Sequence, residues 1–239
     1  MDVLIIPCLN DNYSYLIFDP NKKIGCVIDP GEAKPLIDVI IKNDIKLKYI
    51  LNTHHHYDHV GGNKELKNKF NSKIIGFKGD KDRIPEVDIL VEDNQKWSDD
   101  DFEFEIFHIP GHTSGHICFY FNKEKIAFTG DTLFSLGCGR IFEGTYKQMF
   151  DSLNRLKKLP QDTKIYCGHE YTLQNSKFCE TNDRGNLKLK NKVAEIKDNL
   201  KKGLPTIPTI LSDEIECNIF LRAKDVKSFS KLRDLKDIS

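Results

Sequence analysis

The stretch Leu51–Asn63 (LNTHHHYDHVGGN) carries the residues whose types and spacing could do chemistry. It packs four histidines and an aspartate into six positions: His54, His55, His56, Asp58 and His59. Neighbouring imidazoles repel one another when protonated and lose hydration when buried, so a fold gains little from them unless a cation binds there. Imidazole nitrogen with carboxylate oxygen suits zinc, iron or manganese, and the lack of cysteine argues against a closed structural zinc site. The alternative is a solvated histidine-rich loop that binds metal adventitiously.

The elements around this stretch predict how its side chains are aimed. The apolar run Leu47–Leu51 is typical of a buried strand, and Gly61–Phe70 is typical of an exposed helix. In extended chain, side chains two residues apart point the same way, so His54 and His56 can reach one cation while His55 faces elsewhere. Asp58 and His59 project where the chain turns into the helix. They are therefore predicted to serve a second cation.

Three further predicted strands each end beside a candidate ligand. His112 follows the alternating run 102–109, Asp131 follows 126–128, and His169 follows 164–167. We predict two metals: His54, His56 and His112 on one, Asp58, His59 and His169 on the other, with Asp131 bridging them. Asp58 and Asp131 are the predicted catalytic carboxylates, and Asp29 is a candidate to orient a ligand histidine. His108 and His116 are not predicted to be metal ligands, because a lone histidine more often has a backbone hydrogen bond as its partner than a metal.

Composition limits the classes of function. The 239 residues include 36 basic and 36 acidic side chains, so the formal net charge is zero and no global field recruits nucleic acid or an anionic membrane. No apolar run is long enough to span a bilayer, and the first residues lack the features of a signal peptide. Seven cysteines without a CxxC pair fit reduced thiols. We expect a soluble, cytoplasmic monomer.

The order of the predicted elements indicates an α/β fold with an appendage. Residues 1–168 mix strands and helices, and the predicted strands are 2–6, 13–18, 23–28, 47–51, 73–77, 102–109, 117–121, 126–128 and 164–167. The predicted helices there are 32–43, 61–70 and 146–159. Residues 169–239 favour helices with no clear strand, and the spacing of Leu189, Val193, Ile196 and Leu200 predicts one of them. The expected domains are therefore a catalytic domain at 1–168 and a helical domain at 169–239.

THHHYDHVGGN resembles the THxHxDH signature of the metallo-β-lactamase superfamily. PGHTSGH, FTGDTLF and YCGHEYT resemble its further ligand motifs in the glyoxalase II (hydroxyacylglutathione hydrolase) branch, and GCGRIFEGT and NIFLR narrow the similarity to that branch. The resemblance implies an αββα sandwich with a small C-terminal helical domain that covers the metal site and helps bind glutathione. It also implies that the seven ligands act as assigned, on two divalent cations, zinc first and iron or manganese as alternatives.

The resemblance further implies which residues hold the glutathione part of a substrate. They are Arg140, Tyr171, Arg233 and Lys236, with Phe142 standing where some members have tyrosine. Arg233 and Lys236 stand three apart, so a helix would place both on one face as a clamp for a carboxylate. The alternative for this pair is two solvated cations on a terminal helix.

The implied activity is hydrolysis of S-D-lactoylglutathione and related 2-hydroxyacylglutathiones to D-lactate and glutathione by a metal-bridging hydroxide, the second step of methylglyoxal detoxification. A thiolate leaving group has a pKa near 8.5, so no strong general acid is needed. One alternative is a mononuclear iron persulfide dioxygenase of the same superfamily, which generally lacks the helical appendage. A lactonase or nuclease with the same metals is another. A non-catalytic metal-holding domain would need a damaged ligand set.

Overall fold

The computed structural model describes all 239 residues, and the chain divides into two compact units. The first unit comprises Met1–His108 and Gly115–Glu124. The second comprises Ile109–Ser114 and Lys125–Ser239. Each unit contains both strands and helices.

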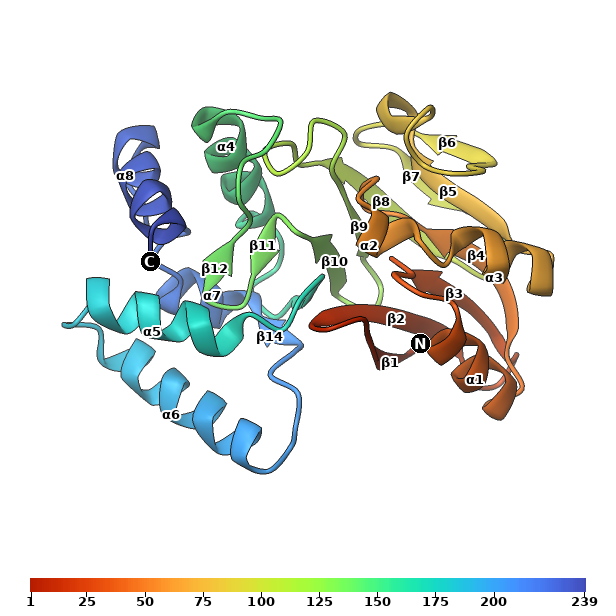
Figure 1. Ribbon diagram of the computed structural model, residues 1–239, viewed down its shortest axis with the longest axis horizontal. Helices are drawn as coiled ribbons and strands as arrows, with labels where there is room; N and C mark the ends of the chain where they lie inside the picture. Colours follow the sequence, from red (N-terminus) through yellow and green to blue (C-terminus); the bar gives the residue numbers. More distant parts are fainter. The chain divides into compact units, whose positions relative to one another are not determined.

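The first unit contains a six-stranded sheet in the sequential order β1-β2-β3-β4-β5-β6 (Figure 1). Strands β1, β2 and β3 pair antiparallel, and β3, β4, β5 and β6 pair parallel. Their bounds are β1 Asp2–Cys8, β2 Asn12–Asp19, β3 Ile24–Ile28, β4 Lys46–Leu51, β5 Lys73–Phe77 and β6 Ile89–Val91. Because β3 and β4 are parallel, Asp29 and Asn52 leave the sheet at the same edge.

Two helices cover one face of this sheet. Helix α1 (Lys34–Lys42) packs against β1 and β2, and α3 (Asn63–Phe70) packs against β4 and β5 (Figure 1). Leu36, Ile40 and Leu66 are buried from these helices in one apolar cluster with the strand residues. The short helix α2 (Tyr57–Val60) and the 3-10 helix η1 (Lys78–Asp80) lie in the connections. Burial of the apolar stripes supplies the main force that holds the helices on the sheet.

A second group of strands in the same unit faces β4. It consists of β7 (Lys96–Ser98), β8 (Glu103–His108) and β9 (Ile117–Phe121), all antiparallel. The Tyr49 ring packs edge-on against Trp97 at 5.0 Å between centroids, and its hydroxyl donates to Asp99 at 2.8 Å. Lys48 also pairs with Asp99, at 2.6 Å. Burial alone would raise the pKa of Asp99, but hydrogen bonds from Lys48, two backbone amides and Tyr49 outweigh it and lower that pKa to about 2.

The second unit combines a few strands with most of the helices. Strand β10 (Ile126–Gly130) is parallel to β13 (Lys164–Cys167), β14 (Thr209–Ile210) is antiparallel to β13, and β11 (Leu133–Phe134) forms a hairpin with β12 (Gly137–Cys138). The helices are α4 Tyr146–Leu156, α5 Thr172–Asn182, α6 Leu187–Lys201, α7 Leu211–Cys217 and α8 Val226–Asp237. A capping box at Thr145 starts α4. Phe150 of α4 packs on Phe229 of α8, with ring centroids 6.0 Å apart.

Most predicted elements are present, and the differences are local. The predicted helix 61–70 begins earlier, as two pieces, α2 and α3. The predicted helix 146–159 ends earlier, at Leu156. Lys158 and Leu159 form i→i−3 backbone hydrogen bonds instead, because Pro160 disfavours helical backbone in the residue before it. The expectation of no strand after residue 169 is wrong: Thr209 pairs with Ile165 in β14. Strands β6, β7, β11 and β12 were not predicted.

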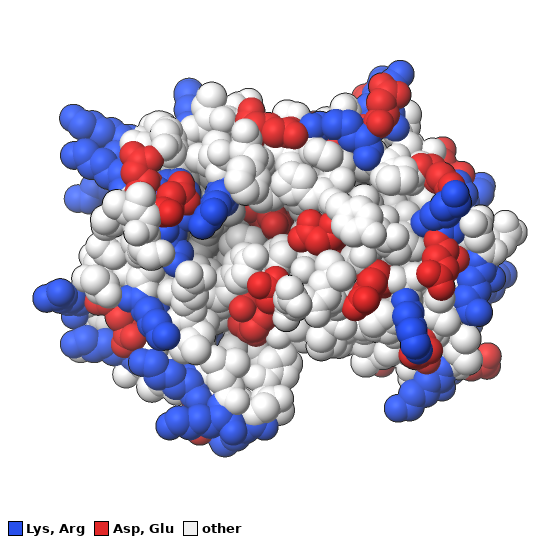
Figure 2. All heavy atoms as spheres, viewed as in Figure 1, with Lys and Arg blue, Asp and Glu red and all other residues white.

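All seven cysteines are buried and none is in a disulfide, in line with the expectation of reduced thiols. None of the helices is long and apolar enough to cross a membrane. Lysines lie on the exposed side of α6, and Figure 2 shows basic side chains gathered at the lower left, where α6 lies in Figure 1.

Candidate metal centre

The histidine loop of the first unit begins where β4 leaves the sheet, and backbone hydrogen bonds hold its start. The Asn52 amide donates to the Ile75 carbonyl at 3.0 Å, and the Thr53 carbonyl accepts from the Ile117 amide at 2.9 Å. The loop therefore leaves the sheet in a fixed direction.

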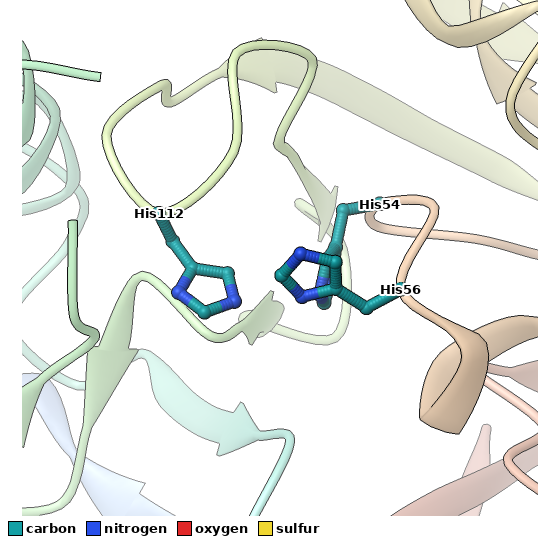
Figure 3. Close-up of side chains that lie close together, drawn as sticks. All are labelled: His54, His56 and His112. Atoms are coloured by element: carbon teal, nitrogen blue, oxygen red, sulfur yellow. The ribbon is translucent and has the colours of Figure 1, made fainter. Parts of the chain in front are cut away.

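His54 and His56 converge as the alternation of side chains predicts. His54 Nε2 lies 3.2 Å from His56 Nδ1, and Figure 3 shows both rings on the loop after β4. His54 is completely buried, and its ring stacks on His116 at 4.6 Å. His55 turns aside, with Nδ1 3.3 Å from the buried carboxylate of Asp80. The expectation that His55 faces elsewhere is confirmed.

Asp58 and His59 come from α2, one turn beyond the loop. His59 Nε2 lies 3.5 Å from Asp58 Oδ2, and His59 Nδ1 lies 3.1 Å from Asp29 Oδ2. Asp29 is buried and also accepts from the Thr53 amide at 2.7 Å. Asn12 donates to Asp58 Oδ2 at 2.9 Å, which fixes that carboxylate. Ligand atoms of Asp29, His54 and His59 lie within 4.8 Å of one another.

The second unit places His112 on a tightly packed turn. Gly111 has φ +152°, and a Cβ there would lie 2.8 Å from Met149 Cβ, so α4 requires glycine at this position. Ser152 of α4 donates to the Pro110 carbonyl at 2.7 Å. His112 Nδ1 lies 2.9 Å from the Arg140 carbonyl oxygen. Because a carbonyl only accepts, Nδ1 carries the proton and Nε2 presents its lone pair (ring drawn in Figure 3).

Asp131 and His169 leave two adjacent parallel strands, β10 and β13. The Gly168 amide donates to the Gly130 carbonyl at 2.9 Å, which holds the two strand ends together. Asp131 Oδ2 lies 3.2 Å from His169 Nε2 and 3.5 Å from His112 Nε2. All three residues are buried. Two imidazole nitrogens therefore face one carboxylate oxygen within this unit.

The donor sets fit divalent cations. Each unit presents imidazole nitrogen and carboxylate oxygen together, which are the ligands of catalytic zinc, iron and manganese sites. Cys167 does not add a thiolate, because burial raises its pKa to about 12 and its thiol donates to the His169 carbonyl at 3.4 Å. Neutral imidazoles held by carboxylate or carbonyl acceptors are ready to bind metal without losing a proton.

The five predicted glutathione contacts all lie in the second unit but differ in exposure. Arg140 and Phe142 are mainly exposed, and the Phe142 ring lies 5.1 Å from that of His112. The Tyr171 ring stacks flat on His169, with centroids 4.7 Å apart. Lys236 is half-buried over the Phe178 ring, and burial together with the nearby Arg233 charge lowers its pKa.

Arg233 is 3% exposed, so it is not the solvated cation that its position on a terminal helix suggests. Its Nη1 donates to the Cys138 carbonyl at 2.7 Å, and its Nη2 donates to Asp237 at 2.9 Å. Sequence reasoning also missed Asn12, Asp80 and Gly139. A Cβ on Gly139 would lie 1.9 Å from the Asp131 carbonyl oxygen. Asn12 and Asp80 carry no local signal, because their partners Asp58 and His55 are 46 and 25 residues away in the sequence.

Residues 10–169 match the family model of the metallo-beta-lactamase superfamily, and residues 170–239 match that of the hydroxyacylglutathione hydrolase C-terminus. The structure of ETHE1 from Myxococcus xanthus superposes with a TM-score of 0.75, at 22% identity, over 98% of this chain and 90% of that one. That likeness concerns the fold alone. The chain belongs to the metallo-β-lactamase superfamily, and it has the mixed α/β fold and C-terminal helical region that were predicted.

Within the superfamily the similarity is closer to one group. A hydroxyacylglutathione hydrolase of Pelagibacter ubique (strain HTCC1062) is 65% identical over 237 residues, which cover 99% of each chain. This protein is a member of the hydroxyacylglutathione hydrolase family. The structure of TTHA1623 in a di-iron-bound form is also similar, with a TM-score of 0.59 at 26% identity, over 71% of this chain and 92% of that one.

Proposed function

We propose that this chain hydrolyses the thioester of S-D-lactoylglutathione and related 2-hydroxyacylglutathiones, and releases D-lactate and glutathione. The 65% identity to a hydroxyacylglutathione hydrolase over the full chain carries the proposal. The match of residues 170–239 to the C-terminal model of the same family supports it. This activity is the second step of methylglyoxal detoxification.

We infer that the seven predicted ligands would hold two divalent cations. His54, His56 and His112 would bind one, Asp58, His59 and His169 would bind the other, and Asp131 is the proposed ligand common to both. Two bound cations supply Lewis acidity and deprotonated water at neutral pH. Zinc is the first candidate, and iron and manganese are the alternatives. Iron is supported by the similar structure of TTHA1623, which is in a di-iron-bound form.

The residues around these ligands keep them ready to bind. Asp29 accepts at His59 Nδ1, and the Arg140 carbonyl accepts at His112 Nδ1, so each ring presents Nε2 to the site. Asn12 restrains the Asp58 carboxylate through Oδ2. Thiolate is a good leaving group, so the chain needs no strong general acid. The described contacts therefore serve to orient ligands and substrate.

The glutathione part of the substrate is proposed to lie against the helical domain 169–239. Arg140, Arg233 and Lys236 are the proposed cations for a carboxylate, and Tyr171 offers a hydroxyl beside His169. Phe142 contributes an apolar face in place of a tyrosine hydroxyl. We infer a cytoplasmic monomer that acts on a small molecule. The zero formal net charge gives no global attraction to nucleic acid or to a membrane.

The first test is loss of thioester absorbance with S-D-lactoylglutathione, using protein whose bound metal has been counted. A simple acyl thioester without glutathione is the control substrate. We expect fast hydrolysis of the glutathione thioester and slow hydrolysis of the control. No hydrolysis with both metals bound would refute the proposal, and oxygen uptake with glutathione persulfide would then test the dioxygenase alternative.

A further inference from the structure

The connection 202–208 leads from α6 to β14 within the second unit (Figure 1). Strand β14 pairs antiparallel with β13, and Thr209 lies opposite Ile165. In an antiparallel pair, the residues before one strand lie beside the residues after the other. The connection is therefore brought alongside the turn 168–171, which follows β13 and carries His169.

Thr206 of this connection bonds the side chain of Glu170, the residue after His169. Its hydroxyl donates to Glu170 Oε1 at 2.8 Å and to Oε2 at 2.7 Å, and its amide donates to Oε2 at 3.4 Å. The Thr206 and Thr172 hydroxyl oxygens lie 2.6 Å apart. Thr172 is buried and Thr206 is half-buried, so solvent weakens these hydrogen bonds less than it would at an open surface.

The same carboxylate holds the start of α5. Glu170 Oε1 accepts from the Thr172 amide at 3.2 Å, and the first amides of a helix have no partner within the helix. Tyr171 is the N-cap residue of α5, but its side chain makes no capping hydrogen bond. Glu170 therefore caps α5 in its place, and Thr206 holds the carboxylate that does so.

His169 and Tyr171 lie on either side of Glu170 in the sequence. The Tyr171 ring stacks on the His169 ring, with centroids 4.7 Å apart and an interplanar angle of 5°. His169 Nε2 lies 3.2 Å from Asp131 Oδ2, the oxygen that also faces the other imidazole of this unit. Because the backbone of Glu170 joins the two stacked residues, a shift of Glu170 would move both rings.

We propose that Thr206 is a positioning residue for His169 and Tyr171, which acts through the carboxylate of Glu170. A connection that offers no ligand of its own then sets the direction of one proposed metal ligand and of one proposed substrate contact. The kinetic part of this inference rests on the proposed function. The parts that concern metal affinity and amide exchange do not depend on the reaction.

The test variant is Thr206→Val, because valine has the same branched shape as threonine and lacks only the hydroxyl. Zinc affinity is measured by competition with a chelator, and amide hydrogen exchange is followed across 172–176. We expect zinc affinity to fall about 10-fold, as for loss of a residue that orients a metal ligand, and these amides to exchange faster. The KM of S-D-lactoylglutathione should rise, and the KM of the thioester without glutathione should not.

Two matched variants separate the hydroxyl from other effects. Thr206→Ser keeps the hydroxyl and should restore the zinc affinity and amide exchange of the wild type. Thr181→Val makes the same change near the other end of α5, where the hydroxyl donates to the Lys177 carbonyl of that helix at 2.9 Å. It should leave zinc affinity and the exchange of 172–176 unchanged.

If Thr206→Val lowers only the free energy of unfolding, with zinc affinity and exchange as in the wild type, Thr206 merely stabilises the connection and the proposal is wrong. An equal loss of zinc affinity in Thr206→Ser would also overturn it. If Thr206→Val does not fold, Glu170→Gln takes its place. Both Glu170 oxygens face backbone amides, so an NH2 group at either position meets a donor and should reproduce the metal and exchange effects.

Wild-type zinc affinity and exchange in Glu170→Gln would overturn the proposal as well. Failure of the proposed function is a separate result. It would appear as no hydrolysis of S-D-lactoylglutathione by the metal-loaded wild type, whereas the zinc and exchange measurements would still decide the role of Thr206.

Discussion

Asp29→Asn tests whether an outer carboxylate sets the metal affinity of the histidine loop. Asp29 is buried and accepts three hydrogen bonds, from the Thr53 amide, the Thr53 hydroxyl and His59 Nδ1. The substitution keeps size and shape, and the remaining oxygen can still accept from the Thr53 amide. The new NH2 group can donate to the Thr53 hydroxyl. It cannot accept from His59, so the ring must give up its Nδ1 proton and lose Nε2 as a ligand.

The magnitude follows from this single lost bond. A hydrogen bond to a buried charged group contributes about 1.5 to 3 kcal/mol, and loss of a partner behind a metal-bound histidine typically lowers affinity about 10- to 100-fold. These two ranges agree. In the metal-free variant, His59 can adopt the other tautomer and accept from the new NH2 group, so the free energy of unfolding should change by less than about 1.5 kcal/mol.

Competition with a chelator measures the zinc affinity, and urea unfolding of the metal-free protein measures the free energy of unfolding. Asp80→Asn is the matched control, because Asp80 is equally buried and bonds His55 of the same loop at 3.3 Å, but His55 is not a proposed ligand. We expect its zinc affinity to stay within about 2-fold of the wild type. Wild-type zinc affinity in Asp29→Asn, or an equal loss in both variants, would refute the reasoning.

Three further outcomes are expected. Gly139→Ala should lower the free energy of unfolding by about 1 to 3 kcal/mol in urea and weaken zinc binding, because the new Cβ would lie 1.9 Å from the Asp131 carbonyl oxygen; wild-type values would contradict this. Burial raises the pKa of Glu214 above its ordinary 4.5, so its contribution to stability is largest below pH 4.5 and is lost as pH rises through the folded-state pKa. In Glu214→Gln, the free energy of unfolding in urea should not show this fall in stability as pH rises above 4.5. The same pH dependence as in the wild type would contradict this prediction. Chelation of bound metal should lower the calorimetric midpoint, by an amount that corresponds to about 2.7 kcal/mol at metal concentrations 100-fold above Kd, and metal addition should restore it.

The arrangement of the proposed ligands on their elements was predictable because it depends on local rules. Alternation along extended chain separates His55 from His54 and His56, and the 3.2 Å approach of the latter two follows from it. Parallel strands bring Asp131 and His169 to one sheet edge, since β10 and β13 end together. The role of Asp29 was also accessible, because it follows β3 directly and β3 neighbours β4.

The missed strands share a different physical origin, because all of them are short. β6 and β7 have three residues, and β11, β12 and β14 have two, too few for a period-2 pattern to show. Thr209 and Ile210 pair with β13 only because the chain returns to it after α5 and α6. Such pairing is decided by tertiary packing, and local propensity carries no information about it.

Arg233 shows where spacing stops being informative. The i,i+3 relation to Lys236 predicts that both side chains share a helix face, but not whether solvent or protein lies against that face. The answer comes from Cys138, 95 residues earlier, whose carbonyl binds the guanidinium, and from Phe220, on which it packs. A buried cation is costly unless it is paired, so these contacts offset part of the cost of burying Arg233. Lys236, three residues on, stays half-exposed over the Phe178 ring, so two cations on one helix face differ in burial.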